Sequence, residues 1–279
     1  MSGDSGSGPQ RRDLASVVAG LREAREHWRD TRVRKRDLAS HEFPSRDIVR
    51  EIMLKLRGAL FPLRLGPPDL KRDGEDFYVG HALDIALDLL HAQVQLEIAW
   101  RAGGEEQRLS REQIVARASS IVAEFAAKLP SLRRLLDTDV EAAYRGDPAA
   151  QSVDEVLLCY PGVLALIHHR LAHELYARGL PLIARIVAEL AHSETGIDIH
   201  PGAQIGAHCF IDHGTGVVIG ETAQIGEHVR IYQAGTLGAK RFETEADGAL
   251  QKGQPRHPIV EDDVVIYAGA TILGRITIG

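Results

Sequence analysis

The chain has 279 residues, 44% of them hydrophobic, so it is long enough for two domains with sizeable cores. A formal net charge of -6 at pH 7 excludes the basic surface by which proteins bind nucleic acid or anionic membranes. The sequence contains no apolar stretch long enough to span a bilayer, and its two cysteines, Cys159 and Cys209, lie far apart. We therefore expect a cytoplasmic protein with no disulfide, no nucleic-acid partner and no membrane partner.

The N-terminal part of the sequence predicts helices. Residues 1–12 are mostly glycine, serine and polar side chains, and we expect a disordered tail there. Apolar residues then recur at spacings of three and four among charged ones, as in amphipathic helices. The predicted helices cover about 13–36, 45–60, 75–101, 110–129, a further helix that starts at Pro130, 160–177 and 180–192. Residues 13–194 therefore form a predicted all-helical domain.

The pattern then changes to one aliphatic residue at every sixth position, which neither a helix nor an ordinary strand produces. The series is Ile199, Ile205, Ile211, then Ile219, Ile225, Ile231, Leu237, then Val260, Ile266, Ile272, Ile278. Such hexads are typical of a parallel β-helix, where each short strand points one side chain into a shared core. We predict this fold for 195–279, with the charged, aperiodic segment 241–256 as a loop insertion. Because the hexads are still in step at Gly279, we expect the native chain to continue.

The hexads break once, where eight residues instead of six separate Ile211 from Ile219. The longer step contains Asp212 and His213, followed by two glycines at 214 and 216. Glycine lets the backbone turn where a Cβ would clash, so we expect the side chains of Asp212 and His213 to leave the stacked wall. The break is the predicted position of the chemistry.

Four motifs in this region carry a family resemblance. They are DIHPGAQIG, IDHGTGVVIGETAQIG, TLGAK and RHPIVEDDVVIYAGATILG, all within 145–279. Together they resemble the serine O-acetyltransferase family of hexapeptide-repeat acyltransferases, in a branch with a long helical N-terminal domain. The resemblance implies an α+β chain whose β-helix is left-handed, assembled as a homotrimer or a dimer of trimers with active sites between neighbouring β-helices. It implies transfer of an acetyl group from acetyl-CoA to L-serine, in cysteine biosynthesis, with no metal.

The resemblance also assigns the catalytic pair. His213 matches the general base and Asp198 the carboxylate paired with it. The assignment is chemically sensible because imidazole titrates nearest neutral pH and a serine hydroxyl attacks a thioester only as its proton is removed. A carboxylate behind the imidazole fixes its tautomer.

The remaining site residues come from the same motifs. Asp147 and Asp212 match contacts to the serine ammonium, Arg256 the partner of the serine carboxylate, and His257 a further substrate-site histidine. A bidentate guanidinium suits a planar carboxylate. Small residues that match the coenzyme A path are Gly238, Ala239, Ala268 and Gly274.

Regulation follows from the same resemblance. L-cysteine carries the ammonium and carboxylate of serine, so the substrate residues are expected to bind it as an inhibitor. The sequence lacks the family's final coils and tail, so docking into a sulfhydrylase through that tail is not expected.

Three other interpretations stay open from the residues alone. The acceptor hydroxyl could belong to another molecule, such as a sugar. His208 and His213 are five residues apart, a spacing that trimeric carbonic anhydrases of the gamma type use to bind zinc between subunits. A non-catalytic trimeric scaffold is the third.

Overall fold

The computed structural model describes residues 13–31, 43–102, 109–241, 250–251 and 253–279. The expected disordered tail at 1–12 and most of the expected loop insertion lie outside these residues. The chain divides into two compact units, 1–42 and 43–279. The first contains helix α1 (Leu14–Thr31), which begins where the sequence predicts and keeps Leu14 and Leu21 of its apolar stripe exposed.

The long helices of the second unit lie where the sequence predicts them, whereas the short helices between them, at 62–65, 72–74 and 153–159, were not predicted. Ser45 caps α2 through the N–H of Ile48, and Ser110 forms the predicted capping box with Gln113 at the start of α5. The helices are α2 (Arg46–Leu60), α3 (Pro62–Leu65), α4 (Glu75–Ala102), α5 (Arg111–Gly146), α6 (Val153–Cys159), α7 (Pro161–Ala177) and α8 (Pro181–Thr195), with a short 3-10 helix, η1, at Arg72–Gly74. None of the described helices combines the length and apolarity needed to cross a bilayer.

The predicted helix boundary at Pro130 is wrong. Helix α5 runs without interruption from Arg111 to Gly146 and carries Pro130 inside it. A proline removes one helical hydrogen bond and crowds the preceding turn. Leu129 and Leu132 on either side of it are buried in the helical core, so packing on both sides outweighs the local cost.

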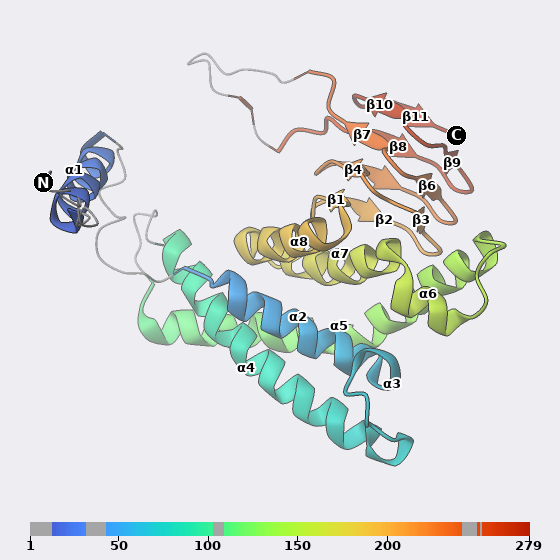
Figure 1. Ribbon diagram of the computed structural model, residues 1–279, viewed down its shortest axis with the longest axis horizontal. Coiled ribbons are helices and arrows are strands. Elements are labelled where there is room, and N and C mark those ends of the chain that lie inside the picture. The colour runs from blue at the N-terminus through green and yellow to red at the C-terminus, as the bar shows by residue number, and fades with distance from the viewer. Residues whose placement is uncertain (1–12, 32–42, 103–108, 242–249, 252) are drawn as a thin grey trace, which may run out of the picture. The chain divides into compact units, whose positions relative to one another are not determined.

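The C-terminal part confirms the predicted parallel strands (Figure 1). The strands are β1 (Asp198–Ile199), β2 (Gln204–Ile205), β3 (Phe210–Asp212), β4 (Val218–Ile219), β5 (Gln224–Ile225), β6 (Arg230–Tyr232), β7 (Thr236–Gly238), β8 (Ile259–Val260), β9 (Val265–Ile266), β10 (Thr271–Leu273) and β11 (Thr277–Ile278). They form three parallel sheets, in the orders β1-β4-β7-β10, β11-β8-β5-β2 and β3-β6-β9. Every third strand therefore returns to the same sheet, as in successive coils of a β-helix.

The hexad residues stack in columns, one column to a sheet. Ile199 pairs with Ile219 and Ile219 with Leu237, while Ile211 pairs with Ile231. These side chains are at most 4% exposed, so the period of six reports the inward positions. Val218 pairs back to Asp198 and forward to Thr236, so the first coil is two residues longer than the second. The extra residues are those of the predicted register break.

Helix α7 closes the start of the β-helix. Its Ala165 and Leu166 belong to the β-helix core, whereas Phe210 of β3 belongs to the core of the helices. The helix approaches closely because Gly162 has no side chain: a Cβ there would lie 2.0 Å from the carbonyl oxygen of Ile211. The two cores thus interlock at the first coil.

A buried ion pair completes this junction. Arg170 on α7 and Asp139 on α5 are 4% and 1% exposed, and two parallel hydrogen bonds of 2.9 Å join them. Arg170 also donates to the carbonyl oxygens of Ile205 and Gly206, while Asp139 accepts from the N–H of Cys209. Burial raises the pKa of Asp139, and its contacts with Arg170 and Cys209 oppose that rise. The carboxylate therefore connects two helices to the first coil.

We expect Asp139→Ala to lower the free energy of unfolding by about 3–5 kcal/mol, because it leaves the Arg170 charge buried without a partner. Asp154→Ala is a matched control, since Asp154 accepts a similar two-bond contact from Arg64 but at an exposed position. Its expected cost is below about 1 kcal/mol. Urea unfolding measures both, and equal losses would contradict a special role for the buried pair.

Candidate functional site

The turn at the register break holds His213 out of the β-helix wall. His213, Gly214 and Gly216 all have positive φ, at 58°, 81° and 76°. The His213 side chain is 72% exposed, as predicted. Asp212 differs from the prediction: it is the last residue of β3 and its side chain is only 8% exposed. The turn begins one residue later than expected, so strand β3 retains Asp212.

Asp212 is buried because it has a cationic partner. Arg230, in the next coil on β6, donates to Asp212 Oδ2 at 2.5 Å and to the carbonyl oxygen of Gly146 at 2.8 Å. The guanidinium lies over the rings of Phe210 and Tyr232, 4.8 and 4.6 Å from their centroids. Arg230 therefore holds the end of α5 against β3.

This contact brings a second carboxylate to the turn. Asp147 is the C-cap of α5, and the hydroxyl of Tyr160 donates to its Oδ2 at 2.5 Å. We define the His213 cluster as Asp147, Tyr160, Asp212, His213 and Arg230. Within it, Asp212 Oδ1 lies 3.8 Å from His213 Nε2. The structure thus assembles three of the predicted site residues from two distant parts of the sequence.

The electrostatics of the cluster favour an ionised Asp147. The Tyr160 hydrogen bond lowers the pKa of Asp147, with smaller contributions from the Ala149 N–H, Arg230 and His213. The same hydrogen bond raises the pKa of Tyr160 to about 12. At neutral pH Asp147 is therefore a carboxylate and Tyr160 a hydrogen-bond donor.

Arg256 and His257 lie in a different cluster. Arg256 donates to Glu221 Oε2 at 2.6 Å, and the backbone N–H groups of Arg256 and His257 both donate to the Thr222 hydroxyl. We define the Arg256 cluster as Glu221, Thr222, Arg256 and His257. Arg275 reinforces it by donating to the carbonyl oxygens of Thr222 and His257.

The contacts of His257 identify its tautomer. The Thr222 N–H donates to His257 Nδ1 at 3.1 Å, so in the neutral ring the proton is on Nε2. Burial lowers the pKa of His257, and Arg256 and Arg275 lower it further. His257 is therefore a neutral ring that presents an Nε2–H donor.

The topology keeps the two clusters apart within one chain. The turn with His213 joins β3 to β4, whereas Arg256 and His257 precede β8, in the segment that follows β7. Strands β4 and β7 belong to the same sheet, so the clusters lie at opposite edges of that sheet. In the described part of the chain, no hydrogen bond or ion pair joins one cluster to the other.

Asp198 lies directly below the His213 turn. Its N–H donates to the carbonyl oxygen of Val217 at 2.9 Å. Its carboxylate has Glu189 and His192 of α8 as neighbours, with one potential ligand atom of each lying within 4.8 Å of the others. Among the described residues, this is the group with the spacing to hold a metal ion, and no hydrogen bond or ion pair joins Asp198 to His213.

The predicted coenzyme A residues occupy both edges of the same sheet. Gly238 and Gly274 are adjacent, since the Gly274 N–H donates to the Gly238 carbonyl oxygen, and Ala239 follows at that edge. Ala268 is exposed and precedes Gly269, whose N–H donates to the carbonyl oxygen of Gln233. Gln233 lies in the turn between β6 and β7, one coil beyond the turn that contains His213. Ala268 therefore shares an edge with the His213 cluster.

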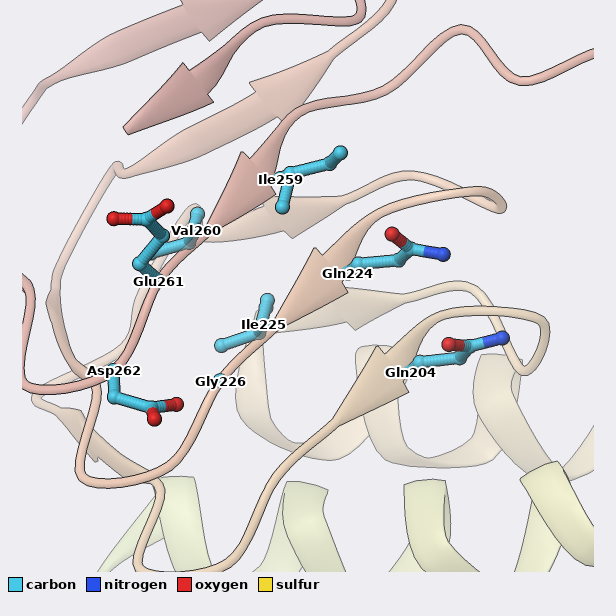
Figure 2. A pocket seen from close by; sticks show the side chains of 8 residues that line it. All are labelled: Gln204, Gln224, Ile225, Gly226, Ile259, Val260, Glu261 and Asp262. Atoms are coloured by element: carbon cyan, nitrogen blue, oxygen red, sulfur yellow. The ribbon is translucent and has the colours of Figure 1, made fainter. Parts of the chain in front are cut away.

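Figure 2 shows the residues that line a hollow on another sheet. The hollow borders the Arg256 cluster, because Arg275 donates to the side chain of Gln224 as well as to the carbonyl oxygens of Thr222 and His257. It has a volume of about 640 Å³ and lies over β2, β5 and β8, where Gln204 and Gln224 form a polar pair on adjacent strands. None of the predicted site residues lines it. Its ionisable lining residues are the carboxylates Glu261 and Asp262, and no histidine or cation accompanies them, so geometry favours the clusters as the site.

Sequence reasoning missed Tyr160, Glu221, Thr222 and Arg230. The position of Arg230 could have been predicted, because Arg230 precedes the inward Ile231 just as Phe210 precedes Ile211 in the preceding coil, so the two residues pair on adjacent strands. Glu221 and Thr222 stand within the quoted IDHGTGVVIGETAQIG motif. Tyr160 had none, since its role depends on where helix α5 ends.

Comparisons with known proteins agree on one family, although no family model matches the chain. A plasmid-encoded serine acetyltransferase of Synechococcus elongatus is 52% identical over 270 residues, which cover 95% of this chain and 83% of that protein. The serine acetyltransferase of Mycobacterium tuberculosis is 54% identical over 141 residues, 50% of this chain and 58% of that protein.

Solved structures give the same result. Entamoeba histolytica serine acetyltransferase 1, in complex with L-cysteine, superposes with a TM-score of 0.68 at 37% identity and covers 83% of this chain and 88% of its own. The native form of that enzyme superposes with a TM-score of 0.67 at 40% identity, and the match covers 81% of this chain and 77% of that one.

We expect Tyr160→Phe to raise the pKa of Asp147 toward its ordinary value, because the hydrogen bond that stabilises the carboxylate is lost. A carbon-13 NMR titration of the Asp147 carboxyl measures this. Tyr144→Phe, an exposed tyrosine on α5, is the control and should leave that pKa unchanged. An unchanged Asp147 pKa in Tyr160→Phe would show that Tyr160 does not stabilise the Asp147 carboxylate.

Proposed function

The chain belongs to the serine acetyltransferase family, and from this premise we propose that the His213 cluster of one chain and the Arg256 cluster of a neighbour form one active site. The enzyme transfers an acetyl group from acetyl-CoA to the hydroxyl of L-serine, in cysteine biosynthesis. This assignment replaces the sugar acceptor, the zinc enzyme and the scaffold that the residues alone left open.

The observation that supports the proposal is the complementary charge of the two clusters. Asp147 and Asp212 offer carboxylates beside the exposed His213, whereas Arg256 and His257 offer a guanidinium and an N–H donor. L-Serine presents an ammonium, a carboxylate and a hydroxyl. Two carboxylates suit the ammonium, a guanidinium suits the carboxylate, and His213 is left for the hydroxyl.

His213 acts as the general base in this proposal. Its imidazole accepts the proton of the serine hydroxyl as that oxygen attacks the acetyl carbonyl carbon, and returns the proton to the departing thiolate of coenzyme A. Acetyl-CoA supplies the acetyl group as a thioester. The positive φ of His213 keeps the ring outside the wall, where a neighbouring chain can present the rest of the substrate site.

Asp198 and Asp212 both lie near the His213 turn, and we assign to Asp198 the role of orienting His213 in the assembled site. Asp212 is nearer, at 3.8 Å, but Arg230 already holds it and the serine ammonium would approach it. Asp198 lies beneath the His213 turn through its bond to Val217. A carboxylate there stabilises the imidazolium as the proton is taken up.

Further parts of the proposal rest on the family. Gly238, Ala239, Ala268 and Gly274 give the pantetheine arm close access to the backbone on both edges of the sheet. L-Cysteine binds the serine site and inhibits. The enzyme is a homotrimer or a dimer of trimers in the cytoplasm, where free Cys159 and Cys209 remain reduced.

An acceptor panel tests the function. Release of free coenzyme A from acetyl-CoA should be fastest with L-serine, and removal of either charge, in 3-hydroxypropionate or serine methyl ester, should cost more than about tenfold in kcat/KM. Homoserine, which keeps both charges, should lose less. The assays run with and without EDTA, and equal rates are expected because no step uses a metal. An equal kcat/KM for serine and 3-hydroxypropionate would contradict the proposal that the site recognises both the ammonium and the carboxylate of serine.

We expect His213→Ala to lower kcat by about a hundred to ten thousand fold, because no other base reaches the hydroxyl. His228→Ala is the matched control, since His228 is also an exposed turn histidine with positive φ, at a different edge of the β-helix. Asp198→Asn should lower kcat and shift its pH profile, whereas Asp212→Asn should mainly raise KM for serine. A near-wild-type kcat in folded His213→Ala would show that His213 is not the general base.

A further inference from the structure

A cavity of about 290 Å³ lies between α2 and α8, away from both clusters. Met53, Leu54 and Leu190 form its apolar wall, and none of its lining residues belongs to the His213 or the Arg256 cluster. Its polar groups are guanidinium groups from α2, one imidazole from α7, and the Ser193 hydroxyl and Glu194 carboxylate from α8.

Arg57 is the most deeply placed of these cations. Its side chain is 18% exposed, and among the residues that the structure describes its ion-pair partner is Glu194, whose carboxylate oxygen lies 3.9 Å from Arg57 Nη1. Within the described part of the chain, the guanidinium makes no hydrogen bond. A guanidinium has five N–H donors, so the half-buried Arg57 retains donors for an oxyanion.

Two more arginines line the cavity. Arg46 donates to the carbonyl oxygen of Glu189 and to the hydroxyl of Ser193. Neither partner is charged, so the exposed Arg46 keeps its charge and further N–H donors available to an anion. Arg50 pairs with Asp47 at an exposed position.

His168 adds an acceptor. It is 2% exposed and lines the same cavity. Its Nδ1 lies 2.9 Å from the carbonyl oxygen of Leu164, so Nδ1 must carry the proton. Burial lowers the pKa of His168 to about 4, which keeps the ring neutral at pH 7. The remaining nitrogen, Nε2, is therefore an acceptor, and no described residue donates to it.

We propose that this cavity binds a small oxyanion that also carries a hydroxyl group, of which inorganic phosphate is the simplest. The oxyanion bonds to Arg57 and Arg46, and its P–OH donates to His168 Nε2. Sulfate has the same shape but no proton at neutral pH, so it leaves His168 Nε2 without a donor. Glu194, 56% exposed, moves away from Arg57 as the anion enters.

Calorimetric titration of phosphate and of sulfate into the full chain tests this, in a buffer free of both. Phosphate should bind at least about tenfold more tightly than sulfate, since a buried acceptor left unpaired costs about 1–3 kcal/mol. Arg57→Gln should weaken phosphate binding by about tenfold or more, and Glu194→Gln should strengthen it by removing the competing carboxylate. Arg64→Gln, an exposed arginine on the adjacent helix α3, should change nothing.

Nitrogen-15 NMR of His168 gives a second readout that does not depend on a variant folding. The Nε2 signal should move when phosphate is added and stay in place when sulfate is added. Equal affinities for the two anions, weaker phosphate binding in Glu194→Gln or an unmoved His168 signal would each overturn the proposal. Absence of phosphate binding would do the same.

Discussion

The fold depends on how the backbone N–H and C=O groups at the outer edge of the first coil find hydrogen-bond partners. Strands β1, β2 and β3 each end a sheet, so their outer backbone groups have no further coil to pair with. The helices supply the partners: Arg170 bonds the carbonyl oxygens of Ile205 and Gly206, and Asp139 bonds the N–H of Cys209. Burying that ion pair is costly, and its hydrogen bonds to the coil are what offset the cost.

The geometry of the His213 cluster is a consequence of that junction. Once α5 is docked on the first coil, its C-cap Asp147 lies beside β3, where Arg230 bonds both the end of the helix and Asp212. The carboxylates of the His213 cluster therefore come from different parts of the fold, and their spacing is set by the helix-to-coil contact. The Arg256 cluster is built instead at the far edge of the sheet, so one chain carries both halves of the proposed site at separate places.

The sequence predicts most of the fold and part of the site, for a physical reason. A period of six fixes which side chain of each coil points inward, so the columns, the longer first coil and the exposed His213 could all be predicted. The predicted helix boundary at Pro130 was wrong because helix propensity is a local property and does not include the packing of the buried Leu129 and Leu132 beside it. The burial of Asp212 and the role of Tyr160 depend on where α5 ends in space, and a one-dimensional period contains no such information.

The most direct test of the shared site is complementation between two inactive variants. His213→Ala and Arg256→Ala chains, refolded together, form interfaces in which both halves are intact, and random mixing should restore about a quarter of the wild-type sites. A mixture of His213→Ala with Asp147→Ala is the control and should restore none, because both changes affect the same cluster. Activity measured as coenzyme A release from acetyl-CoA and serine should recover only in the first mixture. No recovery there, with trimers formed, would contradict an active site shared between chains.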